Sequence, residues 1–213
     1  MKKIYTICFF LSAILNMAVA QDWKLNYGVA AGATSSIYLL ENISSGVGRS
    51  ASKTYNGQVS GWAMLSPNKY FGVEGGLAIT GLGAVLNQSE FGSREVRQHT
   101  YWLQVPVNLV AKLPLRDTSN FFLKVGGYAG VGLFGKNYIP DSYSGSAKQE
   151  FSFGDDGTQK GVDFGWNVSF GYKLRSGYLI NIGYQRGLTD VAPDQAAYEQ
   201  RNRAYTIGIG YEF

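Results

Sequence analysis

The sequence has little of the chemistry that most active sites use. It contains one cysteine and one histidine, and only 16% of its residues are charged. A disulfide needs two cysteines, a zinc site needs several Cys, His or carboxylate ligands, and a Ser-His-Asp triad would have to use His99. We therefore expect no catalytic residue, no metal site and no bound cofactor.

Composition also argues against disordered chains and nucleic-acid-binding proteins. The chain has 5 prolines, but 28 glycines and 15% aromatic residues. Disorder goes with few aromatics and low hydrophobicity, which this balance contradicts. The formal charge is +4, and it falls to +2 if a leader carrying Lys2 and Lys3 is removed. A charge this small does not indicate a nucleic-acid partner.

The first 20 residues have the three parts of a secretory signal peptide. A positive start precedes an apolar run from Ile4 to Leu15, and the small residues Ala18-Val19-Ala20 follow. The run is shorter than the ~20 residues of a membrane helix. We predict cleavage before Gln21, with residues 1–20 as the signal peptide and 21–213 as one domain.

Beyond the leader, large apolar residues alternate with small or polar ones. The last segment shows this most clearly, since Tyr205, Ile207, Ile209 and Tyr211 share one face and small or polar residues lie between them. A period of two predicts β-strands. We expect eight strands, at 23–32, 55–65, 70–82, 98–111, 120–134, 162–174, 177–187 and 204–213.

The connections between these strands alternate in length. Short turns are expected at 66–69, 114–119 and 175–177, and long polar loops at 36–54, 83–97, 135–161 and 188–201. This is the layout of a transmembrane barrel, with the short turns and both termini on the periplasmic side. The sequence therefore predicts an all-β fold, an eight-stranded antiparallel up-and-down transmembrane β-barrel.

The apolar face is expected to meet lipid, because the opposite face is mostly Gly, Ala, Ser, Thr and Asn. A soluble barrel would instead carry charge outside, and eight strands enclose too little room for the large side chains. Successive side chains of a strand point to opposite faces, so several polar side chains are expected to point inward. They form a lumen network: Lys24, Glu74, Gln104, Lys124, Asp163, Asn167 and Lys173. They are read as a paired network that fills a narrow barrel, with an ion path as the alternative.

Some large residues break the rule that large apolar side chains point outward, because they occupy inward positions of their strands: Trp62, Met64, Trp102, Phe122 and Tyr128. Either they plug the lumen or a bulge shifts the register nearby. Pro106 lies in mid-strand, where it cannot donate to the ladder, so we expect a bulge there.

Three weaker motifs have plain interpretations. Asp155-Asp156-Gly157 lacks the further ligands of a calcium loop and is read as a polar turn. The segment Gly126–Gly132 has no Gly-Lys-Ser/Thr after it, so its glycines indicate lumen packing and not phosphate binding. Aromatic residues of the longest loop are candidates for a partner surface: Tyr138, Tyr143, Phe151 and Phe153.

The mature chain resembles the outer-membrane β-barrel proteins of Bacteroidota, the porin-family or PorT-like group. The similarity lies in four segments: Trp102–Val107, Gly126–Gly130, Tyr184–Asp190 and Tyr211–Phe213. Gln104 departs from the family's usual glutamate. The resemblance implies that Tyr211 and Phe213 form a C-terminal signal for the barrel-assembly machinery, and one branch of the family is tied to protein secretion.

The leading hypothesis is an outer-membrane barrel with a structural or surface-interaction role, displaying long extracellular loops to a ligand or protein partner of unknown identity. Its other expected partners are outer-membrane lipid and the barrel-assembly machinery. The alternatives are a narrow porin or transport channel, an accessory component of a secretion system, and a lipid-modifying enzyme. The last is disfavoured because the sequence offers no plausible nucleophile set.

Overall fold

The computed structural model describes residues 23–42, 51–88, 94–115, 119–139, 147–154, 157–196 and 198–213. Within these ranges the chain forms ten strands. Eight are long: β1 (Lys24–Asn42), β3 (Thr54–Ser66), β4 (Phe71–Gln88), β5 (Arg94–Pro114), β6 (Asn120–Ile139), β8 (Val162–Lys173), β9 (Tyr178–Gly187) and β10 (Tyr198–Glu212). Two are short: β2 (Ala51–Ser52) and β7 (Ala147–Phe151). In the same ranges no helix is long and apolar enough to cross a membrane.

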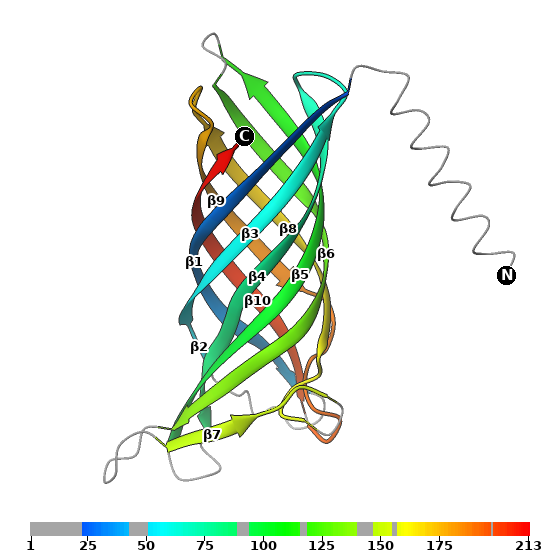
Figure 1. Cartoon of the computed structure of the whole chain (residues 1–213). Coiled ribbons are helices and arrows are strands. Elements are labelled where there is room, and N and C mark those ends of the chain that lie inside the picture. The colour runs from blue at the N-terminus through cyan, green and yellow to red at the C-terminus, as the bar shows by residue number, and fades with distance from the viewer. Residues whose placement is uncertain are drawn as a thin grey trace, which may run out of the picture.

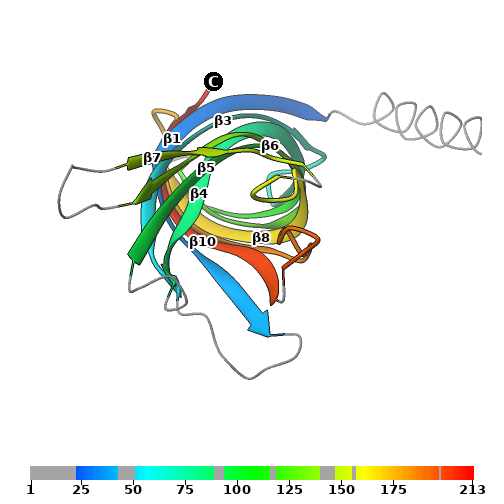
Figure 2. The same ribbon diagram turned by 90° about the horizontal axis from the view of Figure 1, so that it is seen from below.

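The eight long strands close into a ring (Figures 1 and 2). Each pairs antiparallel with the next, and β1 pairs with β10 as well as with β3, so the ring has no free edge. Outside the ring, β2 pairs with β4 and β7 with β6. The prediction of an eight-stranded antiparallel up-and-down barrel is confirmed.

The register fixes how steeply the strands tilt. A path through cross-strand neighbours runs Leu25, Leu65, Val73, Leu109, Val125, Val168, Tyr184, Tyr205 and Ser35. It returns to β1 ten residues beyond its start, which is a shear of ten. With eight strands, this shear corresponds to a tilt of about 40° from the barrel axis.

The short turns lie at the end of the barrel where β1 begins and β10 ends, the upper end in Figure 1. In one of these turns Gly177 has φ 92° and its N–H donates to Leu174 O at 3.1 Å. β2, β7 and the strand ends that the longer connections join lie at the opposite end. In outer-membrane barrels the end with the short turns is periplasmic and the end with the longer loops is extracellular.

The strands are longer at the extracellular end than the sequence suggests. β1, β4, β5 and β6 continue into segments that were predicted as loops at 36–54, 83–97 and 135–161. β10 likewise begins at Tyr198, inside the loop predicted at 188–201. The loop boundaries were wrong because both faces of a strand can be polar beyond the bilayer. The alternation that marks a strand then disappears although the pairing continues.

Apolar side chains cover the outer wall. Ile209 and Leu109 are each 69% exposed, whereas inward-facing Thr34 and Thr80 are each 1% exposed. No charged residue occupies an outward position on β10 between Tyr205 and Phe213, or on β9 between Tyr178 and Tyr184. The predicted orientation is therefore the observed one, with large apolar groups toward lipid.

Large inward rings fit because glycines face them from neighbouring strands. A Cβ on Gly28 would lie 2.4 Å from Trp62 Cζ2, and one on Gly171 would lie 2.3 Å from Phe122 Cζ. These distances are too short for real contacts, so only glycine fits there. The rings and glycines together fill the narrow interior.

The expected bulge at Pro106 is wrong. Pro106 pairs with Tyr128 in the β5–β6 ladder, and the register between β4 and β5 is the same on both sides of it. The proline only interrupts the β4 pairing, which skips Gly76 and Leu77 and resumes at Ala78. The register shift of β5 against β6 lies instead between Tyr101 and Trp102.

Side chains replace ladder bonds where β3 separates from β4. Regular β3–β4 pairing ends at Gln58 and Thr80. Beyond it, Thr34 Oγ1 donates to Gly81 O at 2.6 Å and Ser36 Oγ to Gly83 O at 3.0 Å. The two hydroxyls of β1 thus satisfy carbonyls that a strand neighbour would otherwise bind.

A valine at Gly171 should destabilise the barrel by about 1–3 kcal/mol, because its side chain would overlap Phe122 and the carbonyl of Ile180. The free energy of unfolding can be measured by urea titration of the folded protein in detergent. Gly75→Val is the matched control, since a Cβ there meets nothing within 4 Å. Equal destabilisation by both variants would contradict the packing argument.

Candidate functional site

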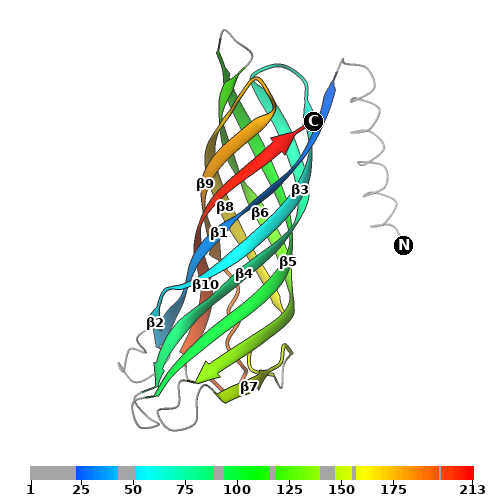
Figure 3. The ribbon, with the colours of Figure 1, turned by 60° about the vertical axis from the view of Figure 1, so that its left-hand side comes forward.

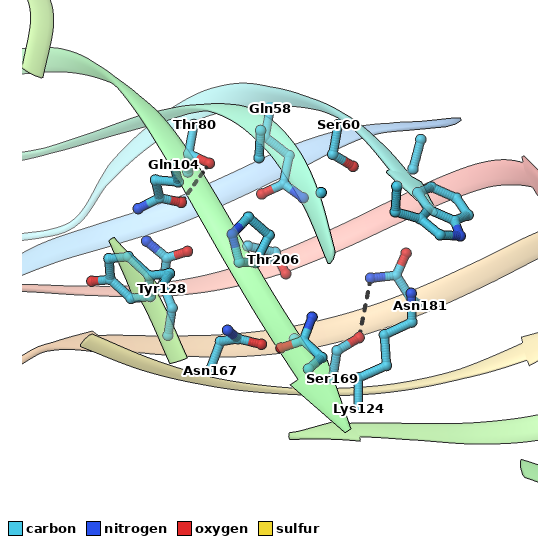
Figure 4. A pocket seen from close by; sticks show the side chains of 18 of the residues that line it. Gln58, Ser60, Thr80, Gln104, Lys124, Tyr128, Asn167, Ser169, Asn181 and Thr206 are labelled. Atoms are coloured by element: carbon cyan, nitrogen blue, oxygen red, sulfur yellow. Dashed lines mark hydrogen bonds between the residues drawn. The ribbon is translucent and has the colours of Figure 1, made fainter. Parts of the chain in front are cut away.

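A polar cavity of about 130 Å³ lies in the middle of the lumen (Figure 4). Amide and hydroxyl side chains line it: Gln58, Ser60, Thr80, Gln104, Asn108, Tyr128, Asn167, Ser169, Asn181, Gln185 and Thr206. Thr80 Oγ1 donates to Gln104 Oε1 at 2.9 Å, and Asn181 Nδ2 donates to Ser169 Oγ at 3.4 Å. The space would hold about four water molecules at roughly 30 Å³ each.

One ion pair borders this cavity. Lys124 Nζ lies 2.6 Å from Glu74 Oε2, and Asn108 Nδ2 donates to the other carboxylate oxygen at 3.3 Å. The ammonium also lies 4.8 Å from the ring centre of Trp62 and 5.1 Å from that of Phe122. Such a cation is held by a carboxylate and two π faces, as a buried charge requires.

A second ion pair lies nearer the periplasmic mouth. Lys173 Nζ contacts Glu212 Oε1, which also accepts a hydrogen bond from Asn26 Nδ2 at 2.8 Å. On the same side Lys112 Nζ donates to Ser66 Oγ at 2.8 Å. The charges at this mouth are therefore engaged with one another and with polar neighbours.

An apolar cluster lies in the periplasmic part of the lumen, beside the two ion pairs. We call it the periplasmic plug, and it consists of Trp62, Met64, Val110, Phe122 and Leu179. Its residues come from β3, β5, β6 and β9, so it spans the ring from wall to wall. The lumen prediction left a plug and a register bulge open at Trp62 and Phe122, and the structure has the plug.

A second apolar cluster lies toward the opposite mouth. This extracellular plug consists of Leu82, Trp102, Val191, Ala204 and Phe153. Trp102 is fully buried; its Nε1 donates to Thr100 Oγ1 at 3.0 Å, and its ring centre lies 5.0 Å from that of Phe153. Val191 and Phe153 come from connections between strands, so these connections fold into the mouth of the barrel.

Hydrogen bonds fix these connections in place. Val191 N donates to Gln200 O at 2.8 Å, and Lys160 N donates to Val191 O at 3.0 Å. Lys160 also forms an ion pair with Asp194 at 2.9 Å, while Asp190 Oδ1 accepts from Gln200 N at 2.8 Å. The extracellular plug is thus tied to the start of β10.

Asp163 differs from the other buried acids because it has neutral partners. It is fully buried, and its Oδ2 accepts hydrogen bonds from Tyr128 OH at 3.1 Å and Asn202 Nδ2 at 2.8 Å. Among the described residues it takes part in no ion pair. The lumen prediction missed Tyr128 and Asn202 as partners, although their inward parity was visible in the sequence.

The structure brings most of the predicted lumen residues inside, but in separate groups. Glu74 and Lys124 form one pair, Gln104 and Asn167 line the cavity, and Lys173 belongs to the mouth. Lys24 is exposed at the first residue of β1, where the wall ends, so it joins none of these groups. Sequence reasoning missed Glu212 as the partner of Lys173, because the terminal motif was read only as an assembly signal.

The remaining candidates give little chemistry. Among the described residues no three His, Cys, Asp or Glu side chains gather as metal ligands do. His99 Nδ1 lies 2.7 Å from Asn56 Oδ1 near the extracellular end of the wall. Three other predictions concern residues outside the described ranges: the polar turn at Asp155 and Asp156, the loop residue Tyr143 and the signal peptide at 1–20.

A closed ring with an apolar outer wall and a polar lumen defines an integral membrane β-barrel protein. The family model "Outer membrane protein beta-barrel domain" matches residues 19–192, so the chain belongs to this family. It is an outer-membrane protein, and membrane lipid surrounds its wall. A search of curated proteins finds no match.

Three solved structures with a similar fold are distant in sequence. OprG of Pseudomonas aeruginosa has a TM-score of 0.50 at 14% identity, covering 88% of this chain and 96% of OprG. Ail of Yersinia pestis, solved in complex with the heparin analogue sucrose octasulfate, scores 0.45 at 12% identity over 89% of this chain and 99% of Ail. Neisserial surface protein A scores 0.42 at 11% identity over 88% and 97%. At this identity the OprG match shows the fold alone.

Removing one member of the Glu74–Lys124 pair should cost about 3–5 kcal/mol, because the other charge stays buried without its partner. Lys124→Met is the test, measured as the urea unfolding free energy in detergent. The double variant Glu74→Leu/Lys124→Met should recover most of this loss. Additive losses in the double variant would show that the two side chains do not act as a pair.

Proposed function

We propose that this protein is a closed outer-membrane barrel that presents its extracellular end for interaction and does not conduct solutes. The observation that carries the proposal is the pair of apolar plugs, one near each mouth of the lumen. Between them lies a cavity of about 130 Å³. A conducting pore would need a continuous polar path, which eight strands filled in this way do not provide.

The extracellular end offers a surface that strands hold in place. β6 continues beyond its pairing with β8 and forms a hairpin with β7, which projects from the ring in Figures 1 and 2. Arg201 binds Glu41 and Glu199 across β1 and β10. A paired, projecting sheet edge is a good support for recognition by a ligand or protein partner.

Several finer assignments belong to the same proposal. The resemblance to Bacteroidota barrels supports placing the chain in that group, with residues 1–20 removed as a signal peptide. We include the absence of catalysis, supported by the surroundings of His99, whose Nδ1 contacts the amide of Asn56 and whose ring packs against Tyr138. A role as an accessory of a secretion system remains an alternative that the same family resemblance supports.

The folded wild-type protein should give no stable conductance steps in a planar bilayer. Opening both plugs with Trp62→Ala, Phe122→Ala, Trp102→Ala and Phe153→Ala together should produce small steps, because the polar cavity then reaches both mouths. A control with equal truncation of the lipid-facing Leu109 and Ile209 should stay silent. Regular steps from the wild type would overturn the closed-barrel proposal in favour of a channel.

We propose that the barrel-assembly machinery reads Tyr211 and Phe213. Phe213 is exposed on the wall at the β1–β10 junction, where its N–H donates to Tyr27 O at 2.9 Å and its ring lies 5.1 Å from Tyr211. An exposed aromatic at the last strand is suited to recognition before the ring closes.

Phe213→Ala should lower the amount of folded barrel in cells several-fold while leaving refolding in detergent unchanged. Heat-modifiable gel mobility measures folded protein in both settings. Phe71→Ala is the control, since Phe71 is also exposed at the periplasmic end of the wall but lies on β4, which does not pair with β10. Equal losses for both variants, or an equal loss in detergent, would count against a recognition role.

A further inference from the structure

Two arginines lie directly opposite each other on the outer wall. Arg186 of β9 is the cross-strand neighbour of Arg203 of β10. Both share the outward face with exposed aromatic and aliphatic side chains, and the row continues to Ile37 on one side and Trp166 on the other. β8, β9 and β10 run side by side in this part of the wall (Figure 3). Directly opposite Cβ atoms are only about 5 Å apart.

This arrangement is unfavourable without a ligand, because like charges facing each other across strands repel. The side chains of Arg186 and Arg203 make no ion pair or hydrogen bond in the described part of the chain, and the Nε atom of each is buried without a partner. Two acids further along, Glu41 and Glu199, are both held by Arg201, at 2.9 and 2.5 Å. The pair therefore keeps its two positive charges.

The position of the pair matches the outer edge of the membrane. Arg203 lies ten residues from Phe213 along β10. At about 3.3 Å per residue and a tilt of about 40°, this is a height of roughly 25 Å, the thickness of the apolar band of such barrels. Just below lie aromatic rings typical of a membrane interface, with Tyr184 5.1 Å from Tyr205 and 5.3 Å from Trp166.

We propose that Arg186 and Arg203 bind the phosphate of an anionic lipid in the outer leaflet. Guanidinium groups form bidentate hydrogen bonds with phosphate oxygens. Two adjacent guanidinium groups together carry the charge that balances a doubly negative phosphomonoester. The aromatic rings of Tyr184, Tyr205 and Trp166 provide an apolar surface on which the first carbons of the acyl chain pack. This site does not depend on whether the lumen conducts.

The direction in which the pair faces favours lipid over an acidic protein. The arginines project sideways from the wall, on the face that carries Ile207 and Ile209 further down. A protein bound at the extracellular end would approach the loops from above, whereas a lipid headgroup lies beside the wall at this level. The charge and the level together specify a phosphate-bearing headgroup.

The test compares phosphatidic acid with diacylglycerol of the same chains, added to the folded protein in maltoside micelles. Native mass spectrometry counts the bound lipids. Wild-type protein should bind phosphatidic acid in preference to diacylglycerol, and Arg186→Gln/Arg203→Gln should weaken this binding about tenfold. Arg186→Lys/Arg203→Lys keeps the charge but loses the bidentate guanidinium geometry. Its affinity for phosphatidic acid should lie between those of the wild type and the glutamine variant.

The control Lys69→Gln/Arg175→Gln removes the same charge from exposed positions in the periplasmic turns. It should bind phosphatidic acid as the wild type does. An equal loss in the control, or unchanged binding in the arginine variant, would overturn the site. Displacement by an equal concentration of inorganic phosphate would show a free-anion site instead of a lipid site. Displacement only by an acidic peptide would favour a protein partner.

Unfolding supplies a second readout. Without anionic lipid, Arg203→Gln should raise the urea midpoint, because it removes the repulsion. Phosphatidic acid should raise the midpoint of the wild type more than that of the variant, since the stabilisation by a ligand falls as its affinity falls. A lipid-induced shift of equal size in both proteins would contradict the proposal.

Discussion

The constraint on which this structure depends is the closed ring of backbone hydrogen bonds. In hydrocarbon an unpaired N–H or C=O costs several kcal/mol, so a sheet can cross a membrane only if its first and last strands meet. Here β1 meets β10 over fifteen residue pairs, from Gly28 with Glu212 to Asn42 with Tyr198. Closure by eight strands with a shear of ten fixes the tilt, and with it the narrow width of the interior.

That width explains how the lumen is filled. A narrow cylinder has no room for large side chains from every strand, so several large inward rings lie over glycines, as Phe122 does over Gly171. The same crowding removes water from the charges. Lys124 therefore has Glu74 and two aromatic faces around it, and Asp163 has two neutral donors. Both the apolar plugs and the paired charges therefore follow from the narrow width of the lumen.

The sequence predicted the ring and its orientation because lipid imposes a period of two on every outward position, as in Tyr205, Ile207 and Ile209. It did not predict the strand ends, because the alternation of apolar and polar residues stops where both faces of a strand are in contact with water. Pairing inside the lumen depends on the shear, which brings Asp163 to Asn202, 39 residues away. Parity tells which side chains point inward but not which of them meet. Val191 was missed because it enters the mouth from a connection.

Charges are placed differently inside and outside this barrel, and the difference has one cause. In the lumen a charge has only protein groups to solvate it, so Lys124 requires Glu74. On the outer wall at the membrane edge, the lipid headgroups can supply the counter-charge. Arg186 and Arg203 can therefore remain without a protein acid, although the rule for cross-strand pairs is broken there. A local rule broken where the surroundings can compensate is typical of a binding site.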